Sequence, residues 1–111
     1  MESLSDWVRS VCDSVLQVND SGAVLELEGV QVIGADPSRG FDVNFALQTY
    51  HPENVLAVHP DDETCEEVLS CITVERFFYV GDDAPEAPDG WKGTPSPHGM
   101  MYERILQNEP A

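Results

Sequence analysis

Apolar and polar residues near the start of the chain first follow a helical spacing and then change to a two-residue alternation. Residues 3–17 carry apolar side chains at helical spacing, and a serine followed three residues later by an aspartate forms a capping box at their start. Residues 23–28 alternate, with leucines on one side and glutamates on the other, which is typical of a half-exposed strand. Gly29 permits a tight turn into a second strand near residues 30–34. This part of the chain therefore predicts one helix and two strands.

The clearest alternation lies in residues 41–49, after a strong turn signal at residues 36–40. Apolar side chains occupy every second position from the first residue of this stretch, and polar ones lie between most of them, so the pattern predicts a strand. A short strand is expected at residues 54–58. Residues 62–72 then place apolar side chains on one helical stripe behind a start rich in carboxylates, which favours a helix.

The C-terminal third changes character twice. Residues 73–80 are rich in β-branched and aromatic types and predict a strand, in which the consecutive aromatic residues 77–79 cannot all face one core. Residues 81–99 contain four prolines and four glycines, which predicts a long loop. The tail, residues 100–107, fits either a closing strand or a short helix, because its periodicity does not decide between them.

The order of these elements indicates an α+β fold for a single acidic domain spanning residues 1–111. We expect a small, mostly antiparallel sheet of four to five strands with two helices packed on one face. The length is sufficient for one core, and a hydrophobic content of 41% is too high for a disordered acidic tail.

Charge narrows the range of functions. The chain has 21 acidic residues against 5 basic ones, a formal net charge of −16, which opposes direct binding to nucleic acid and to anionic membranes. Its apolar stretches are too short to span a bilayer and no secretory leader is visible, so we expect a cytoplasmic location, or the host cytoplasm if a phage encodes it. Acidic self-repulsion destabilises a folded chain. Either a basic partner or a high-salt cytoplasm would account for so acidic a composition.

The acidic residues are concentrated in one region. Residues 61–90 contain ten acidic residues and one base, Arg76. A solvated face is the ordinary interpretation of such a run, and a carboxylate array offered to a nucleic-acid-binding protein is the alternative. Trp91 or Tyr79 could anchor such a partner, although Trp91 could equally pin its loop to the body of the protein. The candidate partner-binding residues are Asp61, Asp62, Glu63, Glu66, Glu67, Asp82, Asp83, Glu86, Asp89 and Trp91.

The preferred hypothesis is an acidic inhibitor that mimics nucleic acid on a basic nucleic-acid-binding protein, as anti-CRISPR or anti-restriction proteins do. It requires no enzyme activity, cofactor or metal, and it fits a monomer or a homodimer. The three cysteines lack the spacing of a metal clip and are expected to be free thiols.

One short motif offers a different function. The sequence VLAVHPDDE at residues 55–63 resembles the zinc-binding motif of the PIG-L/LmbE family of N-acetylglucosaminyl deacetylases. The resemblance implies that His59 and Asp62, within His59-Pro60-Asp61-Asp62-Glu63, bind zinc and that Asp61 is the general base. The family's downstream His-x-x-His is absent. The alternative is that His-Pro ends a strand and the three acidic residues cap a helix.

The N-terminal half shows a second resemblance. A helix followed by AVLELEGVQVIG and FDVNFALQ, all within residues 4–49, is similar to the effector chaperones of type III secretion. This resemblance implies a dimeric α+β body that holds an extended effector segment through apolar patches.

Overall fold

Three helices and six strands make up the described residues, 3–18, 26–34 and 43–105, of a computed structural model. In chain order they are α1 (Leu4–Arg9), β1 (Ser14–Gln17), β2 (Gln31–Gly34), α2 (Val43–Tyr50), β3 (Asn54–Val58), α3 (Asp62–Leu69), β4 (Arg76–Val80), β5 (Trp91–Ser96) and β6 (Gly99–Arg104). None of the helices in these ranges is long and apolar enough to cross a bilayer.

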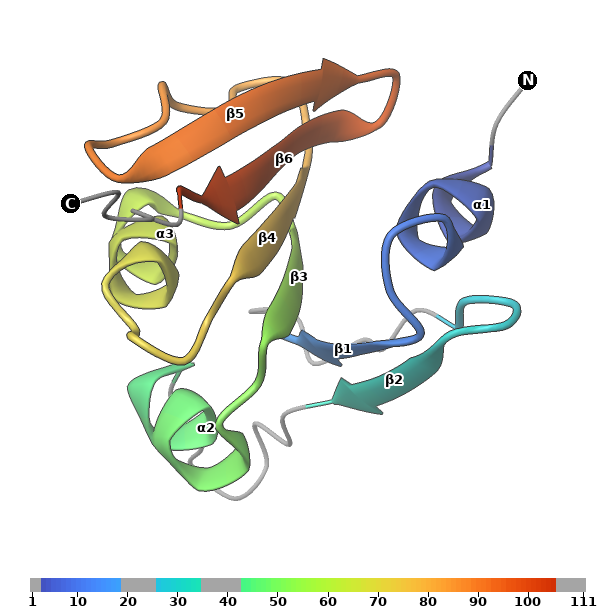
Figure 1. The fold of residues 1–111 in the computed structure, drawn as a ribbon, viewed down its shortest axis with the longest axis horizontal. Helices are drawn as coiled ribbons and strands as arrows, with labels where there is room; N and C mark the ends of the chain where they lie inside the picture. Colours follow the sequence, from blue (N-terminus) through green and yellow to red (C-terminus); the bar gives the residue numbers. More distant parts are fainter. Residues whose placement is uncertain (1–2, 19–25, 35–42, 106–111) are drawn as a thin grey trace, which may run out of the picture.

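The strands form one sheet in the order β2-β1-β3-β4-β6-β5 (Figure 1). Strand β1 lies parallel to β2 and to β3, and β3 lies parallel to β4. Strand β6 is antiparallel to β4 and to β5. The α+β class is confirmed, but the sheet has six strands and is mixed, so the expectation of four to five mostly antiparallel strands is wrong in both respects.

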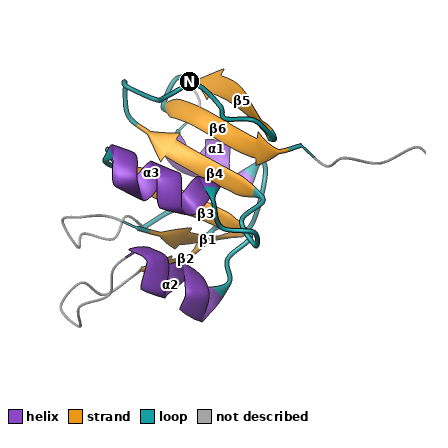
Figure 2. Ribbon diagram, turned by 90° about the vertical axis from the view of Figure 1, so that its left-hand side faces the viewer, coloured by secondary structure: helices purple, strands orange, loops and turns teal. Residues whose placement is uncertain are grey.

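Helices cover both faces of the sheet. Figure 2 shows α2 and α3 in front of the strands and α1 behind them. The first core cluster lies under α2 and α3 and includes Leu47, Val68 and Phe77, whereas the second lies under α1 and includes Trp7 and Phe78. The two helices expected from the sequence, the first and the third of the chain, therefore lie on opposite faces. The expectation that the consecutive aromatic residues face both ways is confirmed, because both faces bury them.

The predicted helix at residues 3–17 is only half right. Its capping box is present, but helix α1 ends at Arg9 and strand β1 follows. Strand β1 lies inside the sheet, where Val15 packs toward α1 and Leu16 toward α2 and α3. A strand that is buried on both faces has a continuous apolar run instead of an alternating one, and a short apolar run is easily taken for part of a helix.

The predicted strand at residues 41–49 is wrong, since residues 43–50 form helix α2. The same residues also satisfy a helical spacing: Ala46 and Leu47 are buried, while Phe45 stays 54% exposed. Strands β2 and β3 both lie parallel to the β1 between them, so the chain between them must cross over, and helices usually form such crossovers. Residues 41–42 and the predicted turn at 36–40 lie outside the described residues.

The other N-terminal expectations have mixed outcomes. The predicted strand near residues 30–34 is confirmed as β2. Of the predicted strand at 23–28, only residues 26–28 are described, and they belong to the approach and turn that precede β2. The short strand at 54–58 is confirmed as β3, the helix at 62–72 as the slightly shorter α3, and the strand at 73–80 as β4.

The predicted loop at residues 81–99 is too long, because the loop ends where β5 begins. Strand β5 is at the edge of the sheet and pairs with β6 on one side only. An edge strand tolerates a proline such as Pro95, because no second neighbour needs its backbone N–H. Gly99 has a φ of +155° and lies so close to β4 that a Cβ there would be 1.9 Å from the Tyr79 carbonyl oxygen. The described part of the predicted tail continues β6 to Arg104, which selects the closing strand over the helix.

Candidate acidic partner-binding surface

The carboxylates of the VLAVHPDDE segment begin helix α3. Asp61 is the N-cap, and its side chain accepts a hydrogen bond from the Thr64 amide at 2.8 Å. This bond and one from the Thr64 hydroxyl hold the pKa of the Asp61 carboxyl below its usual value. Asp62 and Glu63 occupy the first turn, where free amides and the helix dipole favour negative charge.

His59 directly follows strand β3 and has a left-handed backbone conformation, with φ at 49°. Its amide donates to the Val80 carbonyl at 2.8 Å, and its ring lies over Gly81, where a Cβ would come within 3.1 Å of Nδ1. The segment thus has the geometry of the second interpretation, in which His-Pro follows a strand and the acidic residues cap a helix. Across residues 3–18, 26–34 and 43–105 no three His, Cys, Asp or Glu side chains are grouped so that they could hold a metal ion.

Helix α3 and the segment after β4 bring their acidic residues together. Burial raises the pKa of the Tyr79 hydroxyl, and Cys65, Asp83, Asp62 and Asp82 raise it further by their negative charge. Asp62 belongs to α3, whereas Asp82 and Asp83 follow β4, so carboxylates from two segments act on the pKa of one buried phenol. Tyr79 itself is 5% exposed and lies in the core, so it offers a partner almost no surface.

A hollow of about 460 Å³ separates α3 from the segment at residues 84–91. We call it the Trp91 hollow. Its apolar lining is Cys65, Leu69, Pro85, Pro88 and Trp91; its carboxylates are Asp62 and Glu66 on the helix and Glu86 and Asp89 on the facing segment. No base is among its described lining residues. The sequence suggested that these acidic residues belong together, and the structure places four of them, from two segments, in the lining of one concave site.

Trp91 lines this hollow and is 6% exposed. It begins strand β5, and its indole N–H donates to the Leu69 carbonyl at the end of α3, at 3.2 Å. The Arg104 guanidinium lies 4.5 Å from the centre of its ring. Trp91 therefore pins β5 to α3 and forms a wall of the hollow, and little of it is available as a protruding anchor.

Arg104 is a functional candidate that the sequence did not reveal. Its Nη2 donates to the Cys71 carbonyl at 2.7 Å and its Nε donates to the Val74 carbonyl at 3.0 Å. Both acceptors lie in the connection between α3 and β4, about thirty residues away in the sequence, so no local pattern could have indicated the contact. Arg104, the base that the described residues place close to the hollow, is thus directed toward backbone carbonyls and an indole ring.

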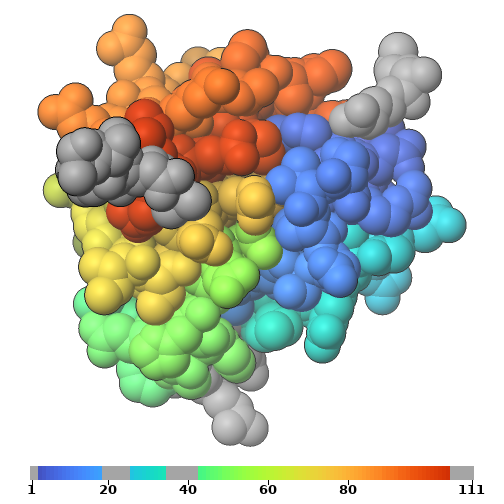
Figure 3. Space-filling model, viewed as in Figure 1, coloured from blue at the N-terminus to red at the C-terminus, as the bar shows by residue number. Residues whose placement is uncertain are grey.

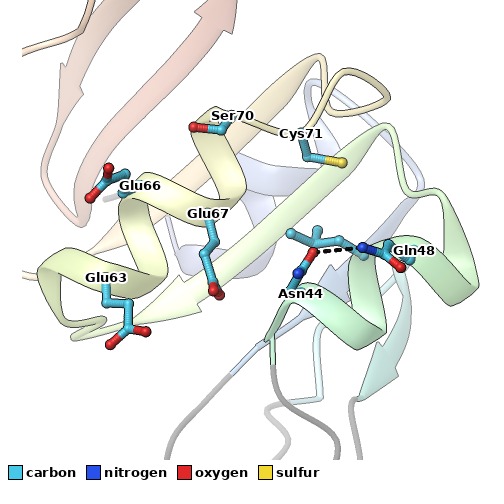
Figure 4. Close-up of a pocket in the computed structure, with 8 residues that line it drawn as sticks. Asn44, Gln48, Glu63, Glu66, Glu67, Ser70 and Cys71 are labelled. Carbon is cyan, nitrogen blue, oxygen red and sulfur yellow. Dashed lines mark hydrogen bonds between the residues drawn. The ribbon is translucent and has the colours of Figure 1, made fainter.

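A second hollow lies on the other flank of α3, between this helix and α2 (Figure 4). In Figure 4, Glu67 extends toward Asn44, and Asn44 accepts a hydrogen bond from Gln48 at 3.0 Å. Glu66 lines both hollows. Helix α3 is therefore an acidic ridge with a concave surface on each side.

Apart from Arg104, the described bases lie away from this ridge. Arg76 on β4 and Lys92 on β5 are both in register with Glu103 on the intervening β6, and the Arg76 Nε lies 3.7 Å from Glu103. Their strand neighbours Phe77 and Trp91 face α3, so this charged row lies on the α1 side. Arg9 pairs with Asp6 within α1 itself. None of these three bases lines either hollow.

We define the acidic face as the nine predicted carboxylates of α3 and the loop that follows β4. Eight of them are exposed and Glu67 is half-buried. They are Asp61, Asp62, Glu63, Glu66, Glu67, Asp82, Asp83, Glu86 and Asp89.

Comparison of the chain with protein-family models, with curated proteins and with solved structures gave no match. The arguments for its function therefore come from the geometry of the acidic face.

Proposed function

We propose that this protein binds a basic nucleic-acid-binding protein through the acidic face and thereby inhibits it, in the manner of anti-CRISPR or anti-restriction proteins. The observation that supports the proposal is the convergence of two acidic segments. Acidic residues on α3 and acidic residues twenty or more positions later line the same Trp91 hollow, and no described base is among its lining residues. A face that only keeps a protein in solution does not need carboxylates in this arrangement.

The free energy of the free protein supports the same interpretation. Carboxylates that surround one site repel one another, which destabilises the unbound protein. A basic surface relieves this repulsion, and the matched potentials accelerate association and exclude partners of the wrong charge. Concentrated charge is thus unfavourable in isolation and useful in a complex.

The test is affinity capture with two charge-matched variants. The target variant replaces Glu66, Glu67 and Asp83 with lysine. The control variant replaces Asp13, Glu26 and Glu53, which are also exposed, with lysine, so both variants gain the same charge. Asp13 and Glu53 immediately precede the parallel strands β1 and β3, so they lie at the amino ends of these strands. Helix α3 begins after the carboxyl end of β3, on the opposite side of the sheet's length.

We expect the wild type and the control variant to capture the same basic protein, and the target variant to lose it. Capture should weaken steeply as NaCl rises, because the attraction between exposed charges is screened. Equal loss in the two variants would show that only the total charge matters, which contradicts the proposal.

Capture that does not respond to salt would point to the chaperone alternative, which uses apolar surface. Phe45 and Tyr50 on α2 are exposed at 54% and 42% and would be the residues to replace. The described part of FDVNFALQ, which contributes to the resemblance to effector chaperones, belongs to helix α2 and not to a strand. The acidic face therefore remains the preferred site.

A further inference from the structure

We propose that the Trp91 hollow receives an arginine side chain of the basic partner, an inference that rests on the proposed function. The side chain would lie along the hollow, with its aliphatic stem on the apolar lining and its guanidinium among the carboxylates.

Charge complementarity identifies the sign of the occupant. Asp62 and Glu66 on α3 and Glu86 and Asp89 on the later segment all line the hollow, and all four are exposed. A cation placed in the hollow is attracted by both segments, whereas an anion is repelled by both. The loop that follows β4 contributes the second pair, because α3 alone would present only its own carboxylates.

The apolar lining indicates which cation fits. Leu69, Pro85, Pro88 and the Trp91 ring offer flat or aliphatic surface, and the indole N–H is already bonded to the Leu69 carbonyl. An occupant therefore needs a hydrophobic body and a cationic end. Arginine has both, and its planar guanidinium is less strongly hydrated than the ammonium of lysine and stacks on aromatic rings.

The lining is held in place before any partner arrives. The Trp91 ring is fixed by its bond to Leu69 and by the Arg104 guanidinium on it. Arg104 in turn holds the connection after α3 through the Cys71 and Val74 carbonyls. A site that is already ordered loses less conformational entropy when it binds.

The test uses capped hexa-arginine and hexalysine peptides and the two indole N–H signals in a nitrogen–proton NMR spectrum. The chain has two tryptophans, and Trp7 packs on the α1 side of the sheet, so it is an internal control. We expect hexa-arginine to shift the Trp91 indole signal saturably and to leave Trp7 unchanged. It should bind roughly twofold to fivefold tighter than hexalysine, because the guanidinium is less strongly hydrated than an ammonium and packs better on the apolar lining.

Neutral variants test whether the carboxylates hold the guanidinium. Glu66→Gln with Glu86→Gln should weaken hexa-arginine binding and reduce the Trp91 shift. Glu26→Gln with Glu53→Gln, which removes the same charge elsewhere, should leave the Trp91 shift intact.

The outcomes separate this inference from the proposed function. If both peptides bind in a salt-dependent manner with equal affinity and the Trp91 signal does not move, the inference is wrong and the proposed function stands. A Trp91 shift of equal size and affinity for both peptides would also overturn the choice of arginine. If neither peptide binds at low salt, the inference and the proposed function both fail.

Discussion

Asp61 shows how a single carboxylate can define the start of an element. As an N-cap it accepts a hydrogen bond from the Thr64 amide, which is the geometry that the helix-capping interpretation of the motif predicts. Its pKa is lowered by that bond. The resulting stabilisation is present above the ordinary carboxyl value of 3.8 and is lost as the pH falls through the lower folded value.

We therefore expect Asp61→Ala to lower the free energy of unfolding by about 0.5–2 kcal/mol at neutral pH. Asp61→Asn should retain most of the stability, because asparagine is an equally good N-cap residue. Urea denaturation followed by circular dichroism measures both. A loss as large in the asparagine variant as in the alanine variant would argue against the capping role.

Two buried groups make the protein sensitive to alkali. Burial is the largest cause that raises the pKa of Cys65 to about 11 and that of Tyr102 to about 12, from 9.0 and 10.0. Both groups ionise less readily in the folded state than in the unfolded state. Each therefore contributes its full stabilisation at a pH below its ordinary pKa. This stabilisation is lost as the pH rises through the folded value.

The free energy of unfolding should therefore fall as the pH rises above about 9. In the Cys65→Ala variant, urea titrations at pH 8 and pH 10.5 should differ less than in the wild type, even though the variant is less stable at both. Cys71→Ala serves as the matched thiol control. An unchanged pH dependence in the Cys65 variant would show that this thiol is not the responsible group.

At the scale of elements, the sequence predicted segments whose local pattern and burial agree. Helix α3 and strands β3 and β4 were predictable, because caps, β-branched residues and the apolar stripe all indicate the same structure there. Strand β1 was not, because it is buried on both faces and its apolar residues do not alternate with polar ones. Residues 43–50 fit both periods locally, and only the crossover between β2 and β3 requires the helix.

Arg104 connects three elements and allows a test at this scale. Arg104→Met keeps a long apolar stem but leaves the Cys71 and Val74 carbonyls without their charged donor. We expect a loss of about 1.5–3 kcal/mol in the free energy of unfolding. Arg9→Met, at an exposed ion pair with Asp6, should lose about 1 kcal/mol or less. Equal losses would mean that Arg104 is no more than another surface base.

At the scale of the whole molecule, the acidic face brings together carboxylates of α3 and of the loop that follows β4. The sequence was sufficient to name the acidic residues, since their density is visible in the residue order. It could not show that α3 and the later loop form one hollow, that Trp91 is buried in it, or that Arg104 points inward, because these depend on contacts between distant segments. Figure 3 shows another contact between segments that are distant in the sequence, because α1, at the start of the chain, lies against β6, near its end.

The concentration of carboxylates in the acidic face predicts a salt-dependent stability. Raising NaCl from about 0.01 M to about 0.15 M shortens the screening length from about 30 Å to about 8 Å, which weakens repulsion within the acidic face. The melting temperature should therefore rise with salt. The Glu66, Glu67 and Asp83 lysine variant should gain less from salt than the Asp13, Glu26 and Glu53 variant, although both have the same net charge. Identical salt responses would show that the repulsion is not local.

The most direct test of the central claim is competition for the captured basic partner. The dissociation constant of the complex would be measured for the wild type and for both lysine variants, with and without the nucleic acid that the partner binds. We expect the nucleic acid to displace the wild type, the control variant to bind like the wild type, and the target variant to bind roughly tenfold weaker or worse. Two results would contradict the claim that the acidic face occupies a nucleic-acid site. One is a partner that binds the nucleic acid and this protein at the same time, and the other is a partner that binds the wild type and both lysine variants equally.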